Sequence, residues 1–599
     1  IRQQANLFTK GIAGVGIRVD GTFNSVIVDK GVKIKADGLN GNGILVSYGK
    51  NHSVAIAQGA SVRALGKGGI GAAFDFGTNM MGIAGEDSAE RASYASRLGK
   101  AASSAAAVDV DGPLVKTFSV QGSLAGKKAA IHIGSGAYVQ NIRIGGGASL
   151  RGPIVSQWMY SDDRLDHANA SAYGSAMHRQ YAGSGELTTM LSFEGSGLSY
   201  GGDIIGQDNM RFSVSGSLAY SGTAKVLSAT VKKGGVLSGG TYNLMQDGVS
   251  GHRLSYSMNS VKKTLRGVGL FANHGMFGAG SSASPARVRG DLQSSGMIFA
   301  RTDAKSSAGI AVSGTADVQG SAAIDLGSMP GETHTALTAS SVKGKTSNGK
   351  SAPLAVSGMM NQYSYRQGNA VRVASVMSDN TGGSGHAFDA VALLYDSLPA
   401  GSAGREAMRP LFGLGASGAR TALRSISSNA AAGSISLLQQ DQLVPHILSA
   451  RMHDVWNLRE DRQKPVSHLW LKSGGRWGTL GNGAHYRGKY AAAGWDTSLG
   501  GGWRGGFLGS YGETDFSPFS ADAELRSGRL GAYAGWQGPK SEVLLFADWS
   551  HAEHELKRGL RALGLRTKAR YHSNMVEAGG EWKVTLAENQ GWRLAPYAG

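Results

Sequence analysis

One serine of this chain stands in a motif that can perform nucleophilic chemistry. Gly197-Leu-Ser-Tyr-Gly201 matches the Gly-x-Ser-x-Gly pattern, in which a sharp strand-to-helix turn exposes the serine of a hydrolase. Residues 202–212 show no helical periodicity, so we interpret the motif as a corner between strands. Gly77-Thr-Asn79 and Gly314-Thr-Ala316 have the glycine and threonine that precede the nucleophile of other serine proteases, but they lack the serine. We therefore assign no catalytic residue.

Two further patterns have the residue types of an ion or cofactor site. Acidic and imidazole side chains gather in one polar stretch, at Asp162, Asp163, Asp166, His167 and His178. These groups can bind a divalent cation, but their spacing fits no known ligand set. Gly66-Lys-Gly-Gly-Ile-Gly71 has the glycine spacing of a dinucleotide-binding loop, yet no helix is expected after it. We predict neither a metal site nor a cofactor.

A third motif concerns recognition and not chemistry. Arg289-Gly-Asp291 is the tripeptide that integrins bind, and the preceding Pro285 suits an exposed loop. In a chain this rich in glycine and arginine, chance is a serious competing explanation. We keep Arg289, Gly290 and Asp291 as a candidate cell-binding site.

The C-terminal part, from about Ser467, alternates apolar and polar residues in segments separated by turns. We expect strands at 468–480, 485–499, 502–515, 523–538, 541–555, 566–585 and 592–599. Such alternation is typical of a membrane β-barrel, whose strands turn apolar residues to lipid and polar residues to the lumen. We predict that the lipid-facing side chains are Leu530, Ala532, Ala534, Val543, Leu545 and Ala547. The predicted lumen-facing side chains are Arg529, Tyr533, Asp548 and Glu577.

Aromatic residues favour this membrane interpretation over a soluble β-sandwich. Tryptophan and tyrosine recur near predicted strand ends, where an aromatic girdle meets lipid headgroups, at Trp470, Trp495, Trp503, Tyr511, Trp536, Trp549 and Trp582. No run approaches 18 consecutive apolar residues, so we expect no transmembrane helix.

The N-terminal part has a different texture. Short β-rich segments closed by Gly, Asn or Asp follow one another closely, for example Ser25–Val28, Gly43–Val46, Ser53–Ile56 and Ser61–Ala64. This spacing predicts the rungs of a right-handed parallel β-helix, in which stacked turns bury a continuous core. Segments 85–107 and 158–184 interrupt it, the first with helical character.

Between the two parts lies a linker. Ser378–Gly385 is small and polar, and helical spacing is expected at His386–Leu398 and from Ala419 to about Trp456, where Pro445 would kink or end a turn. We divide the chain into a β-helical region at 1–377, a linker with a pore-threading helix at 378–465, and a barrel at 466–599. Within the first, 290–377 is expected to act as an autochaperone-like folding template.

The composition limits the compartment and the partners. The chain has 599 residues, no cysteine, and 18 more Lys and Arg than Asp and Glu. Without cysteine there are no disulfides, zinc–cysteine sites or thiol nucleophiles. The basic residues are spread along the chain, so we expect no nucleic-acid partner and favour an anionic surface.

A β-helix, a helical linker and a C-terminal barrel together resemble the type V autotransporters of Gram-negative bacteria. The motifs that carry the resemblance are Arg476-Trp-Gly478, Gly494-Trp-Asp496, Gly531-Ala-Tyr-Ala-Gly535, Glu577-Ala-Gly-Gly580 and Leu594-Ala-Pro-Tyr-Ala-Gly599. Upstream, Ala422-Leu-Arg-Ser-Ile-Ser427 and the helix to Arg451 are similar to the family's pore-threading segment. The family's barrel has more strands than the seven expected here, so we expect a truncated barrel and a fragment of a longer protein.

The resemblance implies an outer-membrane barrel that translocates its own β-helical passenger to the cell surface. Implied partners are outer-membrane lipid, the barrel assembly machinery and host surface proteins, and we expect a monomer. Two passenger roles stay open. The passenger is either an adhesin or virulence-associated stalk, or the stalk of a subtilisin-like protease whose catalytic domain lies upstream. Gly43–Ser47, 69–77 and Asp111-Gly-Pro-Leu-Val115 resemble such a protease stalk.

Overall fold

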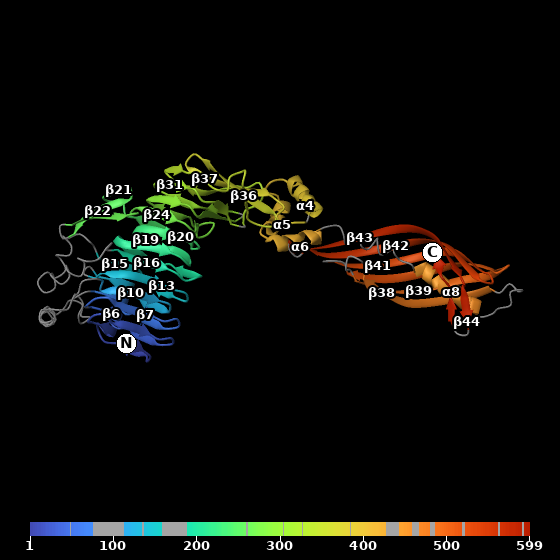
Figure 1. Ribbon diagram of the computed structural model, residues 1–599, viewed down its shortest axis with the longest axis horizontal. Coiled ribbons are helices and arrows are strands. Elements are labelled where there is room, and N and C mark those ends of the chain that lie inside the picture. The colour runs from blue at the N-terminus through green and yellow to red at the C-terminus, as the bar shows by residue number, and fades with distance from the viewer. Residues whose placement is uncertain are drawn as a thin grey trace. The chain divides into compact units, whose positions relative to one another are not determined.

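The computed structural model describes two units. The described residues are 1–47, 49–75, 113–134, 137–158, 188–258, 261–303, 305–325, 327–383, 385–426, 443–457, 467–479, 485–517, 521–560, 563–589 and 592–598. The first unit comprises Ile1–Val356 with Met360–Ser378, and the second comprises Ser357–Met359 with Asp379–Gly599. Figure 1 shows the first as a stack of short strands coloured from blue to yellow-green, and labels the long strands of the second in orange and red.

The first unit is a parallel β-helix with a small three-stranded antiparallel sheet set into it. Its first rungs contain β1 (Arg2–Gln3), β2 (Leu7–Thr9), β3 (Val15–Val19), β4 (Ser25–Val28), β5 (Lys33–Ala36), β6 (Asn42–Val46), β7 (His52–Ile56), β8 (Ser61–Ala64), β9 (Ile70–Phe74), β10 (Val115–Val120), β11 (Ser123–Gly126), β12 (Ala129–Ile133), β13 (Val139–Ile144), β14 (Ser149–Arg151) and β15 (Ile154–Ser156). The middle rungs contain β16 (Thr189–Phe193), β17 (Leu198–Tyr200), β18 (Ile204–Val214), β19 (Ser217–Val231), β20 (Val236–Leu244), β24 (Leu270–Asn273), β25 (Met276–Gly278), β26 (Ala286–Arg289), β27 (Asp291–Ser294) and β28 (Met297–Thr302). The antiparallel sheet contains β21 (Val249–Ser250), β22 (Arg253–Met258) and β23 (Val261–Arg266).

Parallel register between rungs stacks like residues into buried columns. Val26 lies opposite Val54, which lies opposite Phe118 in the next rung. The same column continues through Ile142, Leu191, Phe212, Ala229, Phe271, Leu292, Ala316 and Val342, and all its members are buried. A single rung cannot bury its apolar side chains, so the stacking of rungs creates the core.

The predicted fold class is confirmed, since the first unit consists of parallel β-helical rungs and the second contains an antiparallel sheet. The right-handedness of the β-helix remains a prediction. The Gly-x-Ser-x-Gly motif lies on β17, followed by β18 and not by a helix, so no nucleophile elbow forms. The predicted insertion at 85–107 lies outside the described residues. So does almost all of 158–184, including the acidic and histidine cluster.

The last rungs contain β29 (Ser307–Ala308), β30 (Ile310–Val312), β31 (Thr315–Val318), β32 (Ala322–Ile324), β33 (Thr333–Thr338), β34 (Ser341–Lys343), β35 (Leu354–Ala355), β36 (Met360–Gln367) and β37 (Ala370–Met377). The β36–β37 hairpin ends the stack, because β37 pairs with β33 in the antiparallel direction.

Buried amide side chains complete this end of the stack. The Asn348 side chain accepts from the backbone nitrogen of Ala322 at 2.9 Å and donates to its carbonyl at 2.7 Å, as a neighbouring strand would. Gln362 accepts from Ile324 N at 2.7 Å and donates to Ser375 Oγ at 3.2 Å. These bonds satisfy backbone groups of β32 that would otherwise be left unpaired in a buried place.

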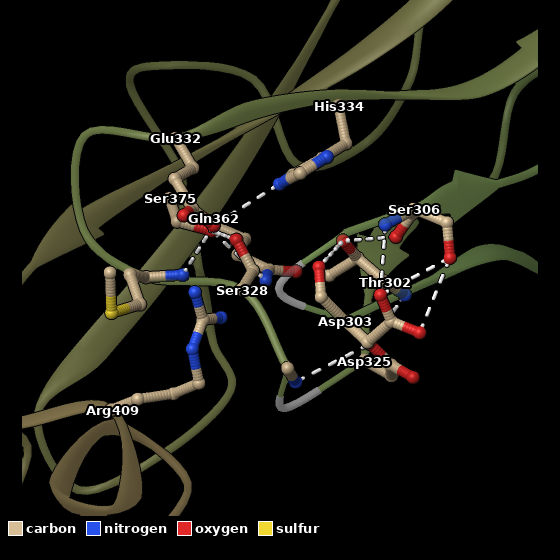
Figure 2. A network of polar contacts seen from close by, with 12 residues as sticks. Thr302, Asp303, Ser306, Asp325, Ser328, Glu332, His334, Gln362, Ser375 and Arg409 are labelled. Carbon is tan, nitrogen blue, oxygen red and sulfur yellow. Dashed lines mark hydrogen bonds and ion pairs between the residues drawn. The ribbon is translucent and has the colours of Figure 1, made fainter. Parts of the chain in front are cut away.

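Figure 2 shows the polar network on this end of the unit, with Gln362 and Ser375 close to Ser328. The hydroxyls of Ser328 and Ser375 lie 2.8 Å apart. Farther along the network, Asp303 accepts hydrogen bonds from the Ser282 hydroxyl and from the backbone nitrogens of Lys305 and Ser306, and these bonds lower the pKa of its carboxyl. This arrangement is a turn that the aspartate stabilises.

Within its described residues, the second unit has the helices α4 (Gly385–Ser397), α5 (Ala403–Phe412), α6 (Ala416–Ile426) and α8 (Leu443–Asn457). Ser402 caps α5 by accepting from Arg405 N. Helix α5 was not predicted from the sequence. Pro445 is the third residue of α8, in the first turn, where a helix needs no backbone donor, so the described helix runs on past it to Asn457.

Long antiparallel strands form the rest of the unit: β38 (Ser467–Thr479), β39 (His485–Gly500), β40 (Trp503–Ser517), β41 (Ala521–Gln537), β42 (Ser541–Leu560), β43 (Leu565–Val584), β44 (Ala587–Asn589), β45 (Trp592–Leu594) and β46 (Tyr597–Ala598). The order β38-β39-β40-β41-β42-β43-β46 makes a meander. The seventh predicted strand, 592–599, is instead two short strands, β45 and β46.

Candidate functional site

One face of the C-terminal sheet, here called the helix face, carries α8. The apolar residues of α8 recur at helical spacing and pack against large side chains that alternate along the strands. The buried cluster joins Leu443, Val444, Ile447, Leu448 and Met452 to Trp470, Ala492, Leu508, Tyr533, Leu544 and Phe546. The contact therefore arises because side chains share one face of the helix at a period of 3.6 residues and one face of each strand at a period of two.

A buried carboxylate ties α8 to this face. Asp496 on β39 is fully buried, and its Oδ2 lies 3.0 Å from Arg451 Nε of α8. Its Oδ1 lies 2.7 Å from Arg504 Nη1 of β40. Tyr533 donates its hydroxyl to Oδ2 at 2.8 Å, and Trp470 Nε1 donates to that hydroxyl oxygen at 2.8 Å.

Such a network is costly to break, because each buried ion depends on the others. Of these residues, the sequence had singled out Tyr533 as lumen-facing and Trp470 as part of the aromatic girdle. The girdle position of Trp470 is wrong, because Trp470 is buried on the helix face beside α8. Register places Asp496 in the same row, since Gly506 pairs with both Asp496 and Tyr533. Alternation could have found the aspartate, but nothing local indicates that Arg451 reaches it.

A second charged cluster lies on the helix face farther along the strands. Arg529 Nη1 lies 3.5 Å from Asp548 Oδ1 and 3.3 Å from Glu577 Oε2. Arg529 and Asp548 are buried, and Glu577 is half-buried. The structure thus brings together three of the four predicted lumen-facing residues, and the fourth, Tyr533, belongs to the Asp496 network.

The opposite face of the sheet, here called the open face, is apolar over much of its length. Leu530, Ala532, Leu545 and Ala547 are exposed, while Ala534 and Val543 are half-buried. Leu469 is 85% exposed and Val576 is 76% exposed, values that are unusual for large apolar side chains in water.

Aromatic rings border this apolar area. Toward the turns at 500–502 and 538–540 lie Trp503 and Trp536, whose ring centroids are 6.4 Å apart. Toward the other ends of the strands lie Tyr511 and Trp549, which are both exposed. The apolar band of the open face therefore has an aromatic row on each side.

Beyond Tyr511 and Trp549, the open face becomes charged. The charged belt consists of Arg487, Lys489, Glu513, Asp515, Glu524, Arg526, Glu553, Glu555, Lys557, Lys568 and Arg570. Cross-strand pairs link its members, such as Lys489 with Glu513 at 3.0 Å and Lys568 with Glu555 at 2.6 Å. The open surface of the same strands thus changes from apolar to charged.

The Arg-Gly-Asp tripeptide lies elsewhere, at a corner of the β-helix. Arg289 ends β26 and is exposed, Gly290 is buried with φ +140°, and Asp291 begins β27. Asp291 Oδ1 accepts from the backbone nitrogen of Thr315 in the next rung at 2.7 Å. The exposed loop expected from the sequence is wrong here, because the glycine and the aspartate are built into the rung.

The described ranges hold no group of three His, Cys, Asp or Glu that could bind a metal ion. Among the helices described, none combines the length and apolar character that a membrane-spanning helix requires.

The C-terminal residues 469–599 match the family model described as Autotransporter beta-domain. No curated protein and no solved structure matches the chain. The matched residues are the strands that carry the apolar open face and the charged helix face, a polarity expected of a barrel in a membrane. Residues 469–599 are thus identified as an autotransporter β-domain, the outer-membrane secretion unit of the type V autotransporters of Gram-negative bacteria.

Proposed function

We propose that the C-terminal domain lies in the outer membrane with its open face in lipid, and that it carries the β-helical region to the cell surface. The observation that supports this most directly is that the two faces of one sheet differ in chemical character. An apolar band covers the open face, while buried charges on the helix face hold a helix.

The height of the apolar band supports a membrane position. On β41 it runs from Trp536 to Gly528, which pairs with Tyr511. These nine residues span about 26 Å along a strand, and a tilt of about 40° reduces that to a height of about 20 Å. An outer-membrane barrel has an apolar band about 25 Å tall, so the two aromatic rows lie near the two headgroup layers.

Charges on the helix face suit an aqueous lumen that α8 occupies. Arg529, Tyr533, Asp548 and Glu577 would face this lumen, where water and the helix satisfy them. An arginine turned to lipid near the midplane costs about 2–4 kcal/mol. Arg451 gives α8 a fixed position in the pore through Asp496, and α8 would be the segment that connects the passenger with the domain that translocates it.

The passenger role is proposed as that of an adhesin or virulence-associated stalk. Its support is the long, regular outer surface of a stack whose core is filled by aliphatic and aromatic columns. Such solenoids present extended binding surfaces. The proposed partners are outer-membrane lipid, the barrel assembly machinery and host surface molecules, with the protein acting as a monomer.

Surface display in a Gram-negative host tests this proposal. The complete gene is expressed, intact cells are treated with protease, and cleavage of the β-helical region is followed. We expect Leu530→Arg to abolish display and membrane insertion, with Leu530→Ala as the matched control that keeps both. Arg526→Ala in the charged belt should also keep display. If Leu530→Arg leaves display intact, the open face does not meet lipid, and if the parent protein shows no surface cleavage, the function is wrong.

A further inference from the structure

The outer face of one β-helical sheet is strongly basic. Strands β2, β5, β8, β11 and β14 form a five-stranded parallel sheet in that order. The basic face, as we call its outward side with the adjoining corner, carries Lys33, Lys35, Arg63, Lys127, Lys128 and Arg151. All six side chains are exposed or half-buried.

Few acids offset this charge. The acids described between residues 1 and 158 are Asp20, Asp29, Asp37 and Asp75. Asp20 pairs with Arg18 and Asp29 pairs with Arg2. Asp37 pairs with Arg63 at 2.6 Å and also accepts from Leu65 N. Hence no described acid forms an ion pair with Lys33, Lys35, Lys127, Lys128 or Arg151.

Register aligns these charges along the stack. Lys35 lies opposite Arg63, which lies opposite Ala125 and then Arg151. A second column runs beside the first and consists of one lysine followed by hydroxyls. In it, Lys33 lies opposite Ser61, which is followed by Ser123 and Ser149. Neighbouring rungs are about 4.8 Å apart, so cations and hydroxyls form two straight rows.

The face carries little apolar surface. Phe8 on β2 is 59% exposed, and Lys35 Nζ lies 5.0 Å from the centre of its ring. Nucleobases bind by stacking on several aromatic side chains, and membranes are bound by apolar groups that insert. The one exposed aromatic ring of the described face already lies under an ammonium group. The face therefore offers neither several rings for stacking nor apolar groups for insertion into a membrane. Rows of cations beside hydroxyls fit a linear chain that carries fixed anions and its own hydroxyls.

We propose that the basic face binds a linear sulfated polysaccharide, with Lys33, Lys35 and Arg151 contacting sulfate groups and Ser61, Ser123 and Ser149 contacting sugar hydroxyls. Polyanion binding releases counterions, so it weakens as salt rises. This inference supplies a ligand for the proposed surface role and rests on it. Binding is nevertheless measured on the purified chain, so its failure can be told apart from a failure of surface display.

The test uses the full chain extracted in nonionic detergent, with immobilised heparin as the probe. In the variant Lys33→Ser, Lys35→Thr, Arg151→Thr, we expect about a 10-fold weaker Kd and a salt dependence that falls by about one log–log unit per lost contact. The matched control is Lys225→Ser, Arg287→Thr, Arg289→Thr, which removes equal charge from exposed positions on another face. It should bind like the parent, and circular dichroism should show both variants folded.

Several outcomes would overturn the proposal. Equal weakening in both variants would mean that net charge alone attracts heparin. Tighter binding of double-stranded DNA or of anionic phospholipid vesicles than of heparin would assign the face to another class of partner. No binding of heparin by the folded parent at low salt would remove the site altogether.

Discussion

The two units of this protein use the same alternation with opposite polarity. In the β-helix, inward residues such as Val54 and Phe271 are apolar and buried, and the outward residues are polar or small. In the C-terminal sheet, large apolar residues such as Leu469 and Val576 are exposed, while Arg529 and Asp548 are buried on the other face. A period of two sorts residues into two faces, but it does not say which face meets water.

The kind of residue on each face, and not the periodicity, therefore indicates which surroundings that face suits. Columns of apolar side chains that face inward in a stack of rungs can only form a protein core. Exposed apolar residues on the face opposite buried ion pairs fit the proposed contact of the open face with lipid.

The largest effect is expected from the buried network on the helix face. Asp496→Ala leaves Arg451 and Arg504 without their shared carboxylate, so it should destabilise the C-terminal domain by about 3–5 kcal/mol. Urea unfolding in detergent measures the change. Asp515→Ala, an exposed acid in the charged belt, is the control and should change stability by less than about 0.5 kcal/mol. Similar losses in both variants would contradict the role of the network.

A matched pair of truncations sharpens the contrast between the two units. Phe271 stacks on Phe277 with ring centroids 4.3 Å apart inside the β-helix, and Phe271→Ala should cost about 3–5 kcal/mol. Leu471→Ala on the open face removes an exposed side chain and should cost far less in detergent. Denaturant unfolding of each unit, monitored by hydrogen exchange, measures the loss of stability in both variants. A cost for Leu471→Ala as large as that for Phe271→Ala would show that the open face is packed against protein.

His132, a buried histidine of the β-helix, tests the cost of burying a charge. Burial, with a smaller contribution from Lys128, lowers the pKa of His132 to about 4 from 6.5. Because the unfolded chain then binds the proton more readily, stability that is present above about pH 6.5 is lost as pH falls toward 4, by about 2–4 kcal/mol.

We expect His132→Gln to flatten the dependence of β-helix stability on pH between 6.5 and 4, measured by denaturant midpoints at several pH values. An unchanged profile in the variant would show that other groups are responsible.

The smallest effect concerns the Arg-Gly-Asp tripeptide. Asp291→Ala removes an acceptor for Thr315 N and should destabilise the β-helix by about 1 kcal/mol, while Arg289→Ala should leave stability unchanged. We expect neither variant to reduce attachment to integrin-bearing cells, because Gly290 is buried in the corner. Loss of attachment in both would restore the tripeptide as a cell-binding site.

Much of the local structure could be predicted from the sequence. The β-helical segments expected at Ser25–Val28 and Ser61–Ala64 have those same bounds in the structure, because glycine-bounded alternation is a local property. Alternation also separated Arg529 and Asp548 from Leu530 and Leu545, and the structure has these pairs on opposite faces. Contact of one of those faces with lipid remains a proposal.

Only the tertiary structure decided which distant residues meet. Arg451 and Asp496 are 45 residues apart, and the hydrogen bond between them depends on where α8 packs on the sheet. Asn348 completes the edge of β32 from a turn 26 residues away, and Lys35, Arg63 and Arg151 form one row through the register of four strands. Periodicity is set by neighbouring residues, but such contacts are set by register and packing, which no short stretch of sequence contains.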